Sequence, residues 1–270
     1  MIPDIFQPWL ERWSLAVDGE AFHTRFGSQL LPVLSGDELA ILKITDQEEE
    51  LRGGALMEWF GGIGAARVIG REGPALLLER LTGERSLAQM ARAGQDDEAT
   101  RILCRTALAL HAPRTRPPPA TLVPLPIWFR ALEPTAAQHG GAFAKAAAAA
   151  RLLLSEPQDP VILHGDFHHD NVLDGGAKGW LVIDPKGLIG ERGFEYANLF
   201  RNPDIGVALG LGQMRRRAQI VTKDAGLETT RLLKWVLAYA GLGAAWSLQS
   251  GHDPGRGLAI AEQAASELAK

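Results

Sequence analysis

The sequence predicts an α+β protein of two lobes that share a cleft. Its 270 residues exceed the length that one hydrophobic core usually organises. Residues 23–45 contain short apolar runs joined by a Gly-containing turn, which is typical of strands, whereas apolar residues recur at helical spacing in most of the chain after residue 83. We therefore expect a β-rich N-terminal lobe over residues 1–82 and a larger helical lobe over residues 83–270.

The composition limits the classes of protein to which the chain can belong. A net charge of −4 argues against general nucleic-acid binding, which requires a basic face. The longest apolar stretch, residues 235–248, is shorter than the roughly 20 residues of a membrane span, and no signal peptide is apparent. The single cysteine, Cys104, excludes an internal disulfide and a Cys-based zinc site. We expect a cytoplasmic protein without nucleic-acid or membrane partners; its oligomeric state is not encoded in these features.

The N-terminal lobe begins with a predicted helix over residues 6–17, where apolar residues have helical spacing. Strands follow at residues 30–34 and 39–44, with the turn Ser35-Gly36-Asp37 between them. Lys43 lies inside the second strand, and a lysine among apolar neighbours is costly unless its ammonium group meets an anion. The structural alternative is a lysine on an edge strand whose ammonium reaches water.

The next predicted helix, residues 47–60, opens with three acids, Glu48, Glu49 and Glu50. Acids stabilise the positive end of a helix, so capping alone explains their presence. Lys43 nevertheless needs a carboxylate to hold it, and Glu49 shares a helix face with the large apolar residues that should pack. We therefore favour Glu49 as the partner of Lys43, although any of the three acids can fill this role.

Residues 161–184 contain the densest group of reactive side chains. A hairpin with its turn at residues 174–176 should bring Asn171 and Asp184 together, because the two residues flank its strands. A carboxylate beside an amide oxygen suits Mg²⁺. Asp166, five residues before Asn171, can then lie near the metal without binding it, where a general base for an alcohol would be placed.

Two other interpretations of this stretch are possible. His164, His168 and His169, together with the neighbouring aspartates, could bind Zn, Mn or Fe in a metallohydrolase. The stretch could also be a polar loop whose side chains satisfy one another. Neither interpretation predicts Lys43 on an upstream strand or the spacing to Asp184.

The spacing of Asp166, Asn171 and Asp184 matches the catalytic Asp, the catalytic-loop Asn and the metal-binding Asp of protein kinases. The His-Gly-Asp sequence that ends at Asp166 and the Ile-Asp-Pro-Lys-Gly sequence around Asp184 resemble the aminoglycoside phosphotransferase family. Within it, residues 168–171 (HHDN) and 184–192 (DPKGLIGER) resemble the streptomycin 6-kinase and hydroxyurea phosphotransferase group. The resemblance implies a two-lobed protein-kinase-like fold.

The resemblance also implies ATP and Mg²⁺ as cofactors and a small-molecule hydroxyl as the acceptor. Asp166 would accept the proton of this hydroxyl, and Asn171 and Asp184 would hold Mg²⁺. Lys43 would contact the α- and β-phosphates, held in place by Glu49. The N-terminal lobe would therefore bind the nucleotide, and the C-terminal lobe would carry the catalytic and acceptor-binding residues.

The remaining nucleotide contacts rest on the resemblance alone. No Gly-x-Gly-x-x-Gly sequence precedes Lys43, so Gly27 and Ser28 are the candidates for the turn that covers the phosphates. The backbone from Glu79 to Leu81 would hydrogen-bond adenine. Lys186, two residues after Asp184, could reach the transferred phosphate, or it could simply face solvent.

The acceptor itself is the weakest inference. His168, His169 and Asp170 are candidates to line its side of the site, and Glu191 could touch it at the active-site mouth. The resemblance favours phosphorylation of streptomycin at its 6-hydroxyl. However, residues 83–270 carry 21 Lys and Arg against 19 Asp and Glu, which gives no support to a strongly cationic acceptor. Hydroxyurea or another small alcohol stays an alternative, as does a nucleotide-binding module without activity.

Overall fold

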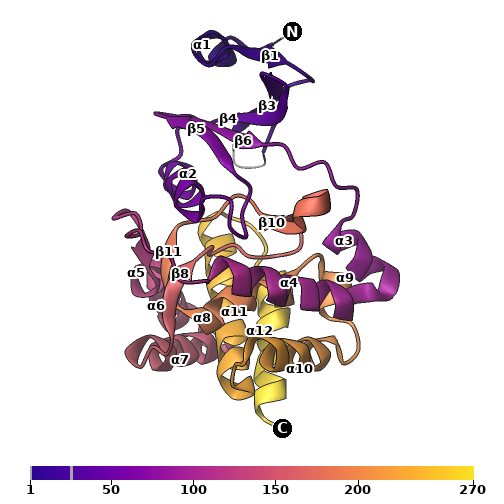
Figure 1. Ribbon diagram of the computed structural model, residues 1–270. Coiled ribbons are helices and arrows are strands. Elements are labelled where there is room, and N and C mark those ends of the chain that lie inside the picture. The colour runs from indigo at the N-terminus through magenta and orange to yellow at the C-terminus, as the bar shows by residue number, and fades with distance from the viewer. Residues whose placement is uncertain (1, 25–26) are drawn as a thin grey trace.

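The computed structural model, which describes residues 2–24 and 27–270, has a β-sheet at its N-terminal end and a mainly helical body beyond it (Figure 1). The sheet is antiparallel, and its strands lie in the order β1-β3-β4-β6-β5, with β2 also paired to β3. Its strands are β1 (Leu15–Val17), β2 (Phe22–His23), β3 (Gln29–Ser35), β4 (Glu38–Ile44), β5 (Val68–Glu72) and β6 (Ala75–Glu79).

The hairpin of β3 and β4 forms as predicted, and it fixes the position of Lys43. Strand β4 lies between β3 and β6, so Lys43 is on a central strand and the edge-strand alternative is wrong. Ala40 and Leu42 point into the hydrophobic core of the sheet. Because side chains alternate along a strand, Ile41 and Lys43 point to the opposite face, where they line a cavity.

The predicted helix over residues 6–17 is shorter in the structure. Helix α1 (Gln7–Arg12) ends before Ser14, whose φ of 51° lies in the left-handed region. The chain then enters strand β1, whose residues pair with β3 along the edge of the sheet. Pairing with an existing strand satisfies backbone groups that a longer helix would have satisfied internally, so tertiary contact overrides the helical spacing.

Helix α2 (Glu48–Phe60) agrees closely with its predicted bounds, and it joins the two parts of the molecule. A Cβ atom at Gly53 would lie 2.1 Å from the carbonyl oxygen of Pro185, so only glycine allows this approach. The side chain of Arg52 adds a hydrogen bond from Nε to the carbonyl oxygen of Lys186, at 2.9 Å. Helix α2 therefore rests directly on the segment that follows Asp184.

The second part of the molecule is built around the buried helix α11, which packs against α7 and α12 (Figure 1). Its helices are α3 (Leu87–Met90), α4 (Asp96–Leu110), α5 (Leu125–Trp128), α6 (Leu132–His139), α7 (Gly141–Ser155), α8 (Arg192–Glu195), α9 (Ile205–Ala208), α10 (Gln213–Ala225), α11 (Thr229–Gln249) and α12 (Gly255–Leu268). Among the described residues, no helix has the length and apolar character needed to cross a membrane.

Short strands position the loops of the second part. Strand β8 (Pro160–Leu163) pairs with β11 (Leu188–Glu191), which also pairs with β7 (Val123–Pro124). The predicted hairpin is present as β9 (Val172–Asp174) and β10 (Trp180–Val182). The chain passes from the sheet to the helices between the end of β6 and the start of α3. The division into a nucleotide-binding lobe over residues 1–82 and a catalytic and acceptor-binding lobe over residues 83–270 stays a prediction.

A buried ion pair ties the helices together behind the short strands. Arg217 on α10 is almost completely buried and donates to both carboxylate oxygens of Asp96, at 2.9 and 2.5 Å. It also donates to the carbonyl oxygens of Leu199 and Asn202, at 2.5 and 2.7 Å. These acceptors belong to the 3₁₀ helix η5 (Tyr196–Arg201) and to the residue that follows it.

We expect the substitution Arg217→Met to lower the free energy of unfolding by about 3–5 kcal/mol, because it leaves the Asp96 carboxylate buried without its cation. The matched control is Arg215→Met on the same helix, since Arg215 pairs with Glu267 at the surface. This change should cost about 0–1 kcal/mol. Urea unfolding measures both values, and equal losses would show that the buried pair has no special structural role.

Candidate active site

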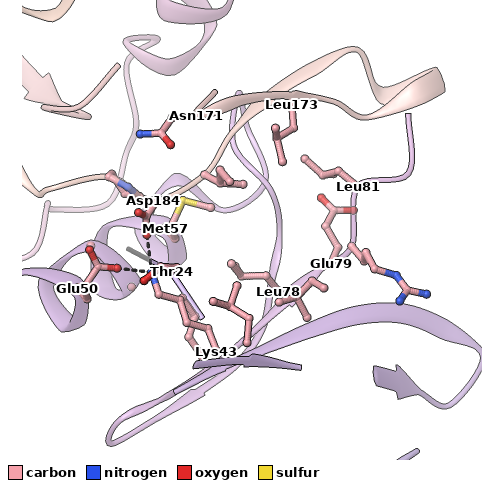
Figure 2. Close-up of a pocket in the computed structure, with 18 of the residues that line it drawn as sticks. Thr24, Lys43, Glu50, Met57, Leu78, Glu79, Leu81, Asn171, Leu173 and Asp184 are labelled. Atoms are coloured by element: carbon pink, nitrogen blue, oxygen red, sulfur yellow. Dashed lines mark hydrogen bonds and ion pairs between the residues drawn. The ribbon is translucent and has the colours of Figure 1, made fainter. Parts of the chain in front are cut away.

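A cavity of about 430 Å³ lies between the sheet and the β9–β10 hairpin. Its walls are apolar and include Leu30, Leu78 and Leu173. Lys43 and Asp184 lie toward one end, whereas Glu79 and Leu81 lie toward the other (Figure 2). The cavity can therefore hold a flat apolar group whose anionic extension points toward Lys43.

Lys43 forms ion pairs with the carboxylates of Glu50, on α2, and of Asp184, on the segment after β10 (Figure 2). The prediction that Glu49 holds Lys43 is therefore wrong, because Glu50 occupies that position. The face of α2 that lines the cavity consists of Glu50, Gly53, Gly54 and Met57. Two glycines give this face little apolar character in the sequence, and the larger apolar residues that favoured Glu49 pack elsewhere.

Lys186 joins the same charged cluster. Its ammonium nitrogen lies 2.8 Å from one carboxylate oxygen of Glu50 and 3.3 Å from one of Glu49. The distance to the Asp184 carboxylate is 3.8 Å. Only 6% of Lys186 is exposed, so the solvent-facing alternative is wrong. Glu50 thus bridges two lysines, one from each part of the molecule.

Mutual attraction keeps Lys186 and Asp184 ionised. Burial alone would lower the pKa of Lys186, but the charges of Asp184 and Glu50 raise it above its ordinary value. Burial alone would raise the pKa of Asp184, but Lys43 and Lys186 lower it. Asp184 therefore stays a carboxylate, the form that binds a hard cation.

Asp166 lies in the loop after β8, and two amide side chains hold its carboxylate. The Asn171 Nδ2 group donates to the backbone oxygen of Asp166 at 2.9 Å and to its Oδ2 at 3.1 Å. The Asn198 Nδ2 group donates to Oδ1 at 2.8 Å. Burial by itself raises the pKa of Asp166, but the neighbouring His168 and Lys186 bring it below its ordinary value.

Sequence reasoning did not find Asn198. It lies in the apolar run 196–200, which reads as the core of a helix, and no spacing rule connects it to Asp166. Its only distinguishing sign in the sequence is an amide among apolar and aromatic residues. The contact with Asp166 depends on the packing of η5 beneath the loop.

His164 supports the loop rather than facing a ligand. Its ring Nε2 lies 2.7 Å from the carbonyl oxygen of Ile183, and its Nδ1 accepts the backbone N–H of Asp166 at 3.2 Å. Glu195 on α8 accepts the backbone N–H groups of His164 and Gly165, at 2.7 and 2.9 Å. Burial lowers the pKa of His164, so its imidazole is neutral near pH 7.

The other two histidines of the loop have different surroundings. His168 Nε2 lies 3.8 Å from Asp166 Oδ1, so His168 is next to the reactive carboxylate. His169 is only 1% exposed and lies beside the Asp96–Arg217 pair. The prediction that His169 lines the acceptor side is therefore wrong, because the ring is enclosed on the interior side of the loop. Asp170 is exposed, and its acceptor role stays a prediction.

The three histidines consequently do not converge on one point. Both ring nitrogens of His164 are used in hydrogen bonds within the protein. Within residues 2–24 and 27–270, no group of three His, Cys, Asp or Glu side chains is arranged to hold a metal ion. The histidine-based metallohydrolase therefore has no support in the geometry.

Glu191 is not at the active-site mouth, so its predicted contact with the acceptor is wrong. It is buried and accepts hydrogen bonds from both Arg231 and Trp235 of α11, at 2.6 and 2.8 Å. It also accepts the backbone N–H of Gln158 at 3.0 Å. Helix α11 lies over the end of β11, so Glu191 holds these elements together.

The remaining nucleotide candidates lie around the first cavity. Thr24 lines it, and its backbone contacts the candidates Gly27 and Ser28. The Thr24 N–H group donates to Ser28 O at 2.9 Å, and the Gly27 N–H group donates to Thr24 O at 3.1 Å. The backbone N–H of Glu79 donates to Arg67, so it is engaged within the protein. Leu81 lines the same end of the cavity. Their contacts with a nucleotide stay predictions.

A second cavity of about 540 Å³ lies on the other side of the Glu49–Lys186 contact. Helix α2 contributes Glu48 and Glu49 to its wall. The helical part of the molecule contributes Trp128 and Trp246. Their rings pack edge to face, with 5.2 Å between the ring centroids. A cavity lined by both acids and aromatic rings suits a cationic organic molecule.

Several known proteins are similar to this chain in sequence or in fold. The chain is 50% identical to the streptomycin 3''-kinase of Klebsiella pneumoniae, over 93% of this chain and 95% of that protein. It is 30% identical to the streptomycin 6-kinase of Streptomyces griseus, over 93% and 84% of the two chains. In fold it is similar to the crystal structure of a thermostable mutant of the aminoglycoside phosphotransferase APH(4)-Ia, with a TM-score of 0.68, 14% identity and coverage of 96% of this chain and 98% of that chain.

The fold similarity confirms the predicted two-lobed protein-kinase-like fold. Residues 12–251 match the sequence pattern of one family along most of the chain. That match, together with the relative at 50% identity, shows that the chain belongs to the aminoglycoside/hydroxyurea antibiotic resistance kinase family.

Proposed function

We propose that this kinase transfers the γ-phosphoryl group of ATP to the 3''-hydroxyl of streptomycin. The observation that carries the proposal is the 50% identity to a streptomycin 3''-kinase over nearly the whole of both chains. The sequence alone favoured the 6-hydroxyl, but the 6-kinase relative shares only 30% identity. The reaction class is the same in both cases, namely ATP-dependent phosphorylation of a hydroxyl group with Mg²⁺.

The first cavity suits the nucleotide. Its apolar walls can take adenine near Leu81, while the triphosphate extends to Lys43. Asn171 and Asp184 both line the Lys43 end, and an amide oxygen and a carboxylate fit Mg²⁺. Because the Asn171 amide nitrogen donates to Asp166, its oxygen is directed away from that carboxylate and is available to a cation. The bound ion would neutralise charge on the phosphate oxygens.

Asp166 is the proposed base. Its carboxylate is ionised, and 27% of the side chain is exposed, so a hydroxyl group can reach it. We assign Lys186 to the transferred phosphoryl group, because its ammonium lies in the cluster that joins Glu50 and Asp184. Phosphoryl transfer depends mainly on positioning and on cancellation of phosphate charge, and these residues supply both.

The second cavity is the proposed acceptor site. The helical lobe carries a small positive net charge, which argued against a cationic acceptor. The acids in this cavity, Glu48 and Glu49, instead come from helix α2 of the N-terminal lobe, which is strongly acidic overall. Two arginines also line the cavity, Arg130 from the helical lobe and Arg52 from α2 itself, so the α2 side has two acids against one arginine. A cationic group would therefore lie toward α2 and stack on Trp128 or Trp246.

The reaction is tested by measuring ADP release with ATP and Mg²⁺ in the presence of streptomycin, hydroxyurea or a plain alcohol. We expect streptomycin-dependent ADP release and a product whose phosphorus couples to the 3'' position in NMR spectra. Phosphate at the 6 position would support the 6-kinase alternative. Release that depends on hydroxyurea alone would reject streptomycin as the acceptor.

The substitution Glu50→Gln should raise the KM for ATP about 10- to 100-fold, because a charged hydrogen bond is worth about 1.5–3 kcal/mol and each 1.4 kcal/mol is a factor of ten. The matched variants Glu48→Gln and Glu49→Gln leave the Lys43–Glu50 pair intact, so the KM for ATP should change less than about threefold. Steady-state kinetics at saturating streptomycin provides the comparison. Equal effects in all three variants would remove the special role of Glu50.

The substitution Trp128→Ala should raise the KM for streptomycin about 2- to 30-fold, since a cation over an aromatic ring contributes about 0.5–2 kcal/mol. The KM for ATP should not change, because Trp128 does not line the first cavity. Trp59→Ala is the matched control, because Trp59 packs near Arg114 and lines neither cavity. An unchanged KM for streptomycin in Trp128→Ala would place the acceptor elsewhere.

A further inference from the structure

The chain contains only three asparagines, Asn171, Asn198 and Asn202, and all of them meet at Asp166 or directly behind it. Asn171 follows the catalytic loop and has an assigned role at the cation. Asn198 and Asn202 lie in and just after η5, about thirty residues further along the chain. Neither residue lines the first or the second cavity.

Asn198 contacts the proposed base directly. Its Nδ2 group donates to Asp166 Oδ1 at 2.8 Å, which is shorter than the 3.1 Å bond from Asn171 Nδ2 to Oδ2. The residue is 6% exposed and does not line either cavity, so it reaches Asp166 from the protein interior. Each oxygen of the carboxylate therefore has its own amide donor.

The amide of Asn198 is itself held in one orientation. Asn202 Nδ2 donates to the backbone oxygen of Asn198 at 2.9 Å and to its Oδ1 at 3.2 Å. With its oxygen engaged as an acceptor, Asn198 presents its nitrogen to Asp166. Arg217 fixes Asn202 in turn, by donating to its carbonyl oxygen at 2.7 Å, and Arg217 is held by Asp96. A continuous hydrogen-bonded chain thus connects a buried ion pair to the carboxylate.

A neutral amide suits this position better than a charged donor. A lysine or arginine against Asp166 would stabilise the carboxylate strongly and weaken it as a base. An amide restricts the rotation of the carboxylate and adds no net charge. A carboxylate has about four lone-pair sites, so two amide bonds still leave it able to accept the hydroxyl proton of an acceptor.

We infer that Asn198 is a positioning residue, which holds the Asp166 carboxylate in the orientation that receives the acceptor proton, and that Asn202 orients Asn198. The inference rests on the proposed role of Asp166 as the base. A base must lie within hydrogen-bonding distance of the proton that it removes, and small errors in its placement are costly. Losing the amide should therefore reduce kcat more than it affects binding.

The test uses the full-length enzyme with ATP, Mg²⁺ and streptomycin. We expect Asn198→Ala to lower kcat about 10- to 100-fold, a part of the 10²- to 10⁴-fold that a positioned base contributes. The KM values for ATP and streptomycin should stay within about threefold. Asn198→Ser, which retains a small donor, should recover part of the lost kcat. Asn202→Ala, which retains the Asn198 amide, should cause a smaller fall than Asn198→Ala.

Two further measurements separate positioning from folding and from the proposed function. Asp166→Asn should abolish turnover while leaving ATP binding intact, and full turnover in this variant would reject the proposed base itself. Gln219→Ala, which removes an exposed amide on α10, is the control for thermal stability and should leave kcat unchanged.

The inference on Asn198 is overturned by either of two results while Asp166→Asn remains inactive. The first is a kcat within about twofold of the native value in Asn198→Ala. The second is a fall in kcat in Asn198→Ala that comes with an equal loss of ATP affinity and a lower unfolding temperature. In that case Asn198→Ser would also fail to recover kcat. Such a result would mean that Asn198 only supports the fold.

Discussion

The contact on which the site depends is the bridge that Glu50 forms between Lys43 and Lys186. One lysine lies on a central strand of the sheet and the other on the loop after Asp184, so the Glu50 carboxylate links the two lobes. Burying charges is costly unless each has a partner, and here every member of the cluster has at least one. The cluster therefore brings together residues that we propose take part in phosphoryl transfer.

Sequence reasoning succeeded where local geometry determines the result. The hairpin after Asn171 has a Gly-containing turn and short apolar strands, so its closure and the return of the chain at Asp184 followed from residues close in sequence. The strand that carries Lys43 was predictable for the same reason. Distant motifs were connected only through resemblance to known kinases, because propensity and periodicity do not specify which lobes meet.

Sequence reasoning failed where packing chooses between equivalent residues. Glu49 and Glu50 differ by one position on a helix, and the choice depends on Gly53, whose missing side chain lets α2 approach Pro185. Glu191 and His169 are polar residues next to reactive ones, yet α11 and the Asp96–Arg217 pair enclose them. Asn198 reaches Asp166 through tertiary structure alone. In each case the deciding contact, such as that of Gly53 with Pro185, joins segments that are far apart in the sequence.

The division of charge between the lobes gives the two cavities different chemistry. The first is lined by Lys43 beside the carboxylates of Glu50 and Asp184, so its ammonium group can meet a triphosphate while the carboxylate and amide oxygens of its wall can meet a cation. The second takes its acids from α2, the same helix that supplies Glu50. Any movement of α2 would therefore alter both cavities together. Nucleotide and acceptor binding should thus be energetically linked through this helix, since each would favour the position of α2 that suits its own charges.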